Sequence, residues 1–154
     1  YPWWWLSIFK RGSLVVKISK TINNKLIGIC EKGFPYEVCG ILIGNKKNSN
    51  YEIENFHECE NINNERANDR YELNPRDYIQ GEKIAKNLGS SIIGIYHSHP
   101  NHPAIASETD KLYAWPEMVY MIYSIYDNKY KDLISWEINE KEDVFQEIRT
   151  DIYE

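Results

Sequence analysis

Short apolar runs rich in Val, Ile and Tyr alternate with polar and turn-forming residues along most of the chain. Such runs are typical of β-strands, and they predict six, over residues 14–18, 38–44, 51–58, 91–99, 119–126 and 132–138. The polar stretch 61–70 has no periodicity and is expected to be a loop, followed by a further short strand over 70–74. The tail from residue 144 fits neither a strand nor a helix clearly.

Two segments show helical spacing of apolar residues instead. The first covers residues 21–31 and ends before Gly33, and the second has Asn74 as N-cap, Pro75 at its first turn and Gly89 as its stop. Together these elements predict an α/β (α+β) domain over 14–154, with a mixed, largely antiparallel sheet flanked by helices.

Composition narrows the class of protein. The 154 residues carry a net charge of −5 without a basic stripe, which argues against nucleic-acid binding. Three cysteines, Cys30, Cys39 and Cys59, are odd in number and lack CxxC spacing, so a reducing, cytoplasmic location is expected rather than a disulfide scaffold. We interpret Cys39 as a packing residue, and we expect a structural role for Cys59 and His57.

The first 13 residues form a tryptophan-rich extension, "YPWWWLSIFKRGS", of unknown role. It is much shorter than the ~20 apolar residues of a membrane span. No positive charge precedes its apolar part, so it does not resemble a secretory signal. We therefore expect no membrane span. The extension is either a set of residues added to the natural chain, an edge segment that docks on the body, or an interaction patch.

The segment "IIGIYHSHPNHPAIASETD" contains the candidate chemistry. His97 and His99 end a predicted strand, so their imidazoles project from one face and could begin a zinc site. Asp110, in a short helix predicted over 107–115, is the candidate third ligand. Alternatively, Ser107 and Asp110 form only a helix capping box.

A hydrolytic zinc also needs a base that takes a proton from water. Glu37 lies at the mouth of the buried strand 38–44 and is the candidate. The alternative for a single Glu at a strand end is a solvated residue without function.

A Glu before an apolar strand, then His-x-His-Pro, six residues and Ser-x-x-Asp, resembles the JAMM (MPN-plus) metalloproteases. Here the pattern is complete in Glu37, "HSHP" at 97–100, Ser107 and Asp110. "PYEVCGILIG", "RYELNP" and "YHSHPNHPAIASETDKLYAWP" also resemble the small stand-alone prokaryotic branch, which includes cysteine-releasing peptidases of ubiquitin-like sulfur carriers. The resemblance covers residues 14 to 140 and implies the MPN fold, which is cytidine-deaminase-like.

The resemblance implies a role for each matched residue. His97, His99 and Asp110 would bind one catalytic Zn²⁺, with water in the fourth position. Glu37 would be the general base that activates this water, and Ser107 would stabilise the oxyanion. His102 falls outside the ligand set and is expected to form part of the groove wall.

The implied substrates are peptide or isopeptide bonds after the Gly-Gly tail of a ubiquitin-like protein, which would lie extended in a groove and augment a strand. Only 44 residues follow Asp110, which favours a sulfur-carrier type of substrate over the deubiquitinase-like alternative with its extra loops. A non-catalytic MPN binding or scaffold module is the other alternative, although such modules typically lack the Glu or the ligands. The DNA-repair relatives carry Ser-Gly after His-Pro, where this chain has Asn101 and His102.

Overall fold

The computed structural model describes residues 14–112, 114–139, 141 and 143–154, so the tryptophan-rich extension over 1–13 lies outside the described residues. The elements follow in the order β1 (Val15–Ser19), α2 (Lys20–Gly33), β2 (Cys39–Lys47), β3 (Asn50–Cys59), α3 (Pro75–Asn87), β4 (Ser91–Pro100), α4 (Glu108–Leu112), β5 (Val119–Tyr126), β6 (Lys129–Asn139) and β7 (Val144–Tyr153). Among these described residues, no helix is both long and apolar enough to cross a membrane.

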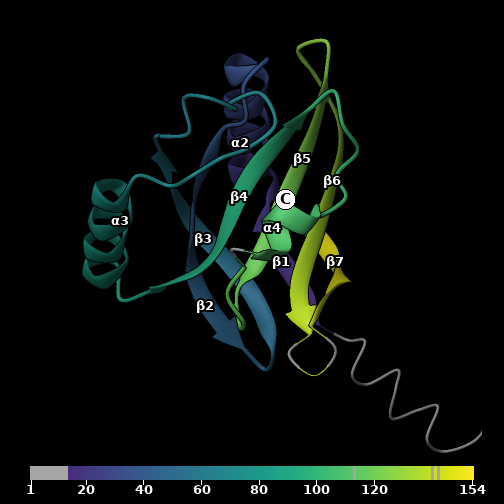
Figure 1. The fold of residues 1–154 in the computed structure, drawn as a ribbon. Coiled ribbons are helices and arrows are strands. Elements are labelled where there is room, and N and C mark those ends of the chain that lie inside the picture. Colours follow the sequence, from purple (N-terminus) through teal and green to yellow (C-terminus); the bar gives the residue numbers. More distant parts are fainter. Residues whose placement is uncertain (1–13, 113, 140, 142) are drawn as a thin grey trace, which may run out of the picture.

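The strands form one mixed sheet that closes on itself (Figure 1). Their order is β1, β3, β2, β4, β5, β6 and β7, and β7 returns to pair with β1. The pairs β2–β3, β2–β4, β5–β6 and β6–β7 are antiparallel, whereas β1–β3, β4–β5 and β1–β7 are parallel. This confirms the predicted mixed, largely antiparallel sheet with flanking helices, but its closure was not predicted.

Closure depends on β7, the tail whose pattern was ambiguous. β7 pairs antiparallel with β6 through residues 144–148 and parallel with β1 through residues 149–153. Most of its side chains are exposed, and Ile148 is the buried exception. Because the strand is fixed by backbone pairing more than by apolar burial, hydrophobic periodicity carries little information about it.

The local signals for the two long helices are confirmed. Ser19 caps α2 by accepting a hydrogen bond from the N–H of Ile22, and Asn74 caps α3 by accepting one from Arg76. After α3, Gly89 adopts φ +68°, the left-handed conformation of a helix stop. α4 ends at Leu112, so the predicted span 107–115 was too long; Pro116 follows closely and cannot continue a helix.

The predicted strand over 70–74 was wrong. Only an isolated antiparallel bridge joins Asn61 to Leu73 there, made by Ile62 N–H to Glu72 C=O and Asn74 N–H to Glu60 C=O. Asn61–Asn74 is therefore a long connection whose two ends meet once.

β4 separates two apolar clusters. Tyr96 packs with Leu26 and Cys30 of α2 in the larger one, whereas Ile41 of the neighbouring β2 packs with Ala85 of α3 in the smaller one. His97 pairs with Cys39, two residues before Ile41, so its side chain lies on the α3 side of the sheet. In Figure 1, α3 stands beside β2, β3 and β4, and α4 lies in front of β5.

Candidate metal centre

The end of β4 brings two imidazoles together on one face. His97 and His99 are two residues apart on the strand, and their Nε2 atoms lie 3.2 Å from each other. His97 is fully buried and His99 is 8% exposed. His99 Nδ1 is 2.8 Å from the carbonyl oxygen of Pro103, and donation to that carbonyl leaves Nε2 free as a ligand atom.

Asp110 completes this group from α4. Its Oδ1 lies 3.3 Å from His97 Nε2, and its Oδ2 lies 3.3 Å from His99 Nε2. Ser107 N–H also donates to Asp110 Oδ2, while Asp110 N–H donates to Ser107 Oγ. Asp110 therefore takes part in a capping box and also faces both imidazoles, so the capping interpretation does not exclude a ligand role.

Glu37 lies beside the histidines, buried at the entrance to β2. Glu37, His97 and His99 each bring one ligand atom to within 4.8 Å of the others, a cluster that could hold a metal ion. Glu37 is 4% exposed, and within the described part of the chain its Oε1 atom has no hydrogen-bond partner. The interpretation of Glu37 as a solvated residue is therefore wrong.

Hydrogen bonds to Ala67, Asn61 and Ser98 hold the backbone around Glu37. Its N–H donates to the carbonyl of Ala67 at 2.6 Å, and its carbonyl accepts from Asn61 Nδ2 at 3.0 Å. The next N–H, that of Val38, donates to Ser98 Oγ at 2.9 Å. Ser98 lies between His97 and His99 in the sequence of β4. The strand that carries the two histidines therefore also holds the segment that carries Glu37.

Burial and neighbouring charges shift the pKa values of Glu37, His97 and Asp110 in different directions. Burial, with the carboxylates of Asp110 and Asp69 nearby, raises the pKa of Glu37 to about 8 against the opposing effect of His99. Burial lowers the pKa of His97. Although burial alone would raise the pKa of Asp110, the two histidines and Ser107 N–H hold it well below its usual range.

The donor atoms fit a tetrahedral ion. Metal–ligand bonds of ~2.0–2.1 Å in a tetrahedral site place the ligand atoms ~3.3–3.4 Å apart. The Nε2 atoms of His97 and His99 lie 3.2 Å apart, and they lie 3.3 Å from Asp110 Oδ1 and Oδ2 respectively, so the spacings are close to this value. Two imidazoles and one carboxylate are also a ligand set that zinc accepts.

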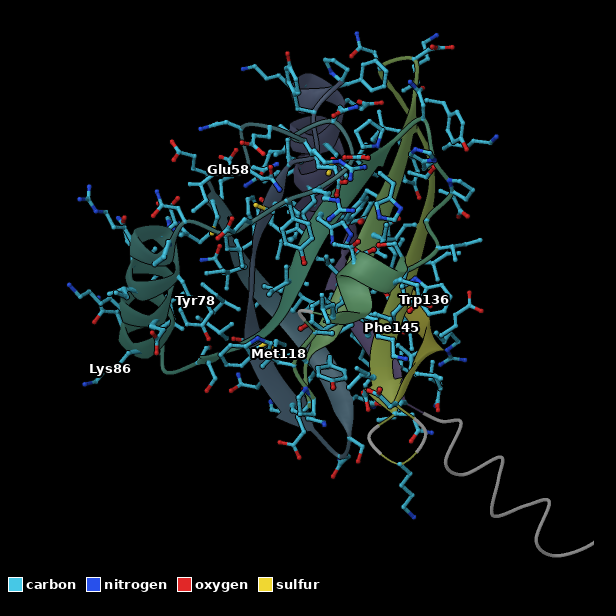
Figure 2. All side chains as sticks on the ribbon, in the orientation of Figure 1. Glu58, Tyr78, Lys86, Met118, Trp136 and Phe145 are labelled. Atoms are coloured by element: carbon cyan, nitrogen blue, oxygen red, sulfur yellow. The ribbon has the colours of Figure 1, made fainter. Side chains whose placement is uncertain are left out.

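The turn between His99 and Ser107 is held by residues of β5 and β6. Trp136 Nε1 donates to the carbonyl of Ala104 at 3.0 Å, and the hydroxyl of Ser124 donates to the carbonyl of His102. The Trp136 ring packs against Phe145 of β7, and Figure 2 shows the two side by side. Strands far away in the sequence thus determine where Ser107 and Asp110 lie.

A cavity of about 490 Å³ opens next to Asp110. Its apolar lining includes Leu73, Tyr78, Trp115 and Met118, and Figure 2 shows Tyr78 on the α3 side and Met118 near the sheet. Trp115 is 61% exposed. His102 is exposed and is not among the residues that line this cavity, so its role in a groove wall stays a prediction.

The sequence interpretation missed two residues of the site because they lie in the polar connection 61–74. Tyr71 stacks on the His97 ring at 4.5 Å between centroids and an angle of 28°, and it lines the cavity. Asn61 holds the carbonyl of Glu37. An aromatic residue within the largely polar connection, in "RYELN", was the available signal for Tyr71.

Comparisons with solved structures agree with this fold. A solution structure of a protein from Desulfitobacterium hafniense matches with a TM-score of 0.79 at 24% identity, over 92% of this chain and 94% of that one. A solution structure of a protein from Salinibacter ruber matches with a TM-score of 0.66 at 29% identity, over 89% of each chain.

Sequence comparisons identify the family. A desampylase from Haloferax volcanii is 33% identical over 93 residues, which are 58% of this chain and 63% of that protein. This chain thus matches less than two thirds of the length of that relative. The family model described as prokaryotic homologs of the JAB domain matches residues 19–139. The predicted JAMM resemblance is therefore confirmed, and the chain belongs to the family of prokaryotic homologs of the JAB domain.

Proposed function

We propose that this protein is a zinc-dependent peptidase or isopeptidase that cleaves after the Gly-Gly tail of a ubiquitin-like protein. The observation that carries the proposal is a buried group in which the Nε2 atoms of His97 and His99 lie 3.2 Å apart and each lies 3.3 Å from one oxygen of Asp110. Beside it, Glu37 Oε1 has no hydrogen-bond partner among the described residues. A relative named as a desampylase supports a hydrolytic activity of this kind.

In the proposed site, His97, His99 and Asp110 hold the metal ion. Zinc, when bound there, would act as a Lewis acid and lower the pKa of a bound water to ~7. The Nδ1–H of His99 on the Pro103 carbonyl keeps its Nε2 available to the metal.

Glu37 is the proposed general base. It takes a proton from the attacking water and delivers it to the leaving amine, which requires a carboxylate that no neighbour has already engaged. In the part of the chain that the structure describes, its Oε1 atom meets this requirement. Ser107 Oγ accepts the Asp110 N–H, so its own hydroxyl hydrogen is free to donate to the oxyanion that develops on the scissile carbonyl.

A short backbone edge beside the cavity supports recognition of an extended tail. The Arg70 carbonyl and both backbone groups of Glu72 bond to Asn61 and Ile62. Since alternate residues of an extended segment point in opposite directions, the backbone groups of Tyr71 and Leu73 point away from this partner, on residues that line the cavity. A peptide tail could add there as a strand.

The proposed substrate is a small modifier of the sulfur-carrier type, and a cytoplasmic location is part of the same proposal. The test is incubation with a panel of such proteins and with ubiquitin, each extended past Gly-Gly by Cys, Lys or a short peptide. Mass spectrometry then identifies the bond that is cut. A cut after Gly-Gly that Glu37→Gln abolishes supports the proposal.

Metal analysis separates this proposal from the binding-module alternative. Wild-type protein should retain one equivalent of zinc, and His97→Ala should lose it. Zinc binding without cleavage of any panel member would favour the non-catalytic module. Cleavage by fully metal-free protein would contradict the mechanism.

A further inference from the structure

The side chain of Asn61 uses its complete hydrogen-bonding capacity. Its Nδ2 group donates to the carbonyls of Glu37 at 3.0 Å and Arg70 at 2.9 Å. Its Oδ1 atom accepts from the N–H groups of Asn63 and Glu72, both at 3.0 Å. A primary amide has two donor hydrogens and two acceptor lone pairs, so all four are engaged.

These four bonds join two parts of the proposed site. One donor bond reaches the residue that carries the base, and the other three fix the connection that presents Tyr71 and Leu73 at the cavity. Glu37 and Tyr71 are far apart in the sequence, and the side-chain amide of a third residue, Asn61, connects their segments. A single half-buried side chain is thus shared between the base and the edge on which a tail would lie.

The other hydrogen bonds around Glu37 do not reach the Arg70–Glu72 backbone. Ser98 holds Val38 from β4, and the Ala67 carbonyl holds the Glu37 N–H from the middle of the connection. The bridge at Leu73 joins only the two ends of the connection to each other. Asn61 alone bonds by its side chain both to Glu37 and to the Arg70–Glu72 backbone, among the residues that the structure describes.

We propose that Asn61 is a positioning residue that fixes the Tyr71–Leu73 edge and the Glu37 carboxylate relative to each other. Binding of the tail and activation of water then depend on the same side chain. The inference rests on the proposed function. Asn61 touches none of the residues proposed as zinc ligands through the bonds described, so its role is distinct from metal binding.

Asn61→Asp is the main test variant, because it keeps the shape and the acceptors but replaces the two donors by an oxygen facing two carbonyls. With a cleavable tail substrate, kcat should fall about tenfold or more and KM should rise about tenfold, from the loss of two hydrogen bonds of ordinary strength. Zinc affinity should stay within about twofold of wild type. Asn61→Ala, which removes all four bonds, should shift both constants further in the same directions.

Asn23→Ala is the matched control. It removes the buried bond from the Tyr123 hydroxyl to Asn23 Oδ1, at 2.7 Å, from the α2 side of the sheet. It should lower the melting temperature without changing kcat or KM. A change in only one constant for Asn61→Asp, or an equal change in the control, would overturn the inference.

Amide hydrogen exchange of the metal-free protein tests the same inference without substrate. The N–H groups of Glu37 and Ile62 bond to Ala67 and Glu72 and not to Asn61, so they report whether the two segments are held. Both should exchange about tenfold faster in Asn61→Asp and Asn61→Ala, but not in Asn23→Ala. Acceleration of only one, or of neither, refutes the coupling, whether or not any substrate is ever cleaved.

Discussion

Replacing Trp136 by Phe should weaken zinc binding although Trp136 does not approach the metal centre. The substitution removes the Nε1–H that donates to the Ala104 carbonyl at 3.0 Å, and it keeps an aromatic ring beside Phe145. Ala104 is 1% exposed, so water cannot easily replace the lost donor. The affected turn connects His99 to Ser107 and Asp110.

The expected magnitude follows from this one bond. A buried carbonyl left without a partner costs ~1–3 kcal/mol, which corresponds to ~5-fold to ~150-fold in an equilibrium constant. Two other contacts, to the carbonyls of Pro103 and His102, continue to hold the turn. Only part of this free energy therefore disturbs the geometry of the ligands. We expect zinc affinity to drop about tenfold, which is the low end of the range for mutations of groups that support metal ligands.

Competition with a chelator of known zinc affinity measures this effect, and thermal unfolding of the metal-free protein measures the accompanying loss of stability. Phe145→Leu is the control, because it loosens the same aromatic contact and leaves the Trp136 hydrogen bond in place. The reasoning is refuted if Trp136→Phe binds zinc as tightly as wild type, or if Phe145→Leu weakens zinc binding equally.

Three further results are expected. Chelation should abolish cleavage and one equivalent of Zn²⁺ should restore it, measured by mass spectrometry; activity that survives complete metal removal would contradict the mechanism. Ser107→Ala should lower turnover by ~10²–10³ while zinc stays bound, and loss of the metal would show instead that Ser107 acts mainly by capping Asp110. Gly40→Ala should destabilise the fold by ~1–3 kcal/mol in denaturant titration, because the added Cβ would lie 2.3 Å from the buried Tyr96 ring; unchanged stability would mean that the ring moves freely.

The sequence was informative where local chemistry decides structure. The caps at Asn74 and Gly89 and the apolar run of β4 were recognisable because each depends on neighbours within a few residues. The interpretation failed where distant pairing decides. "RYELN" has strand-like composition, but only Leu73 finds a bridge, to Asn61, so no ladder forms there.

In the proposed metal site too, local spacing predicts some features and tertiary contacts determine the others. Two-residue spacing on a strand was enough to place His97 and His99 together, and three-residue spacing at a helix start linked Ser107 to Asp110. These relations follow from the periods of a strand and a helix. What brings Asp110 to 3.3 Å from both imidazoles is the turn held by Trp136, a contact that no local pattern encodes.

By itself, the sequence determined most element types, with β7 and residues 70–74 as exceptions, together with the motif residues and the family resemblance, since these depend on residue identity and short spacing. Only the tertiary structure decided that the sheet closes through β7, that Glu37 is buried with no partner for Oε1 among the described residues, and that Asn61 connects it to the cavity edge. The physical reason is that burial and hydrogen-bond pairing between distant segments depend on how the strands assemble, and hydrophobic periodicity does not specify that assembly.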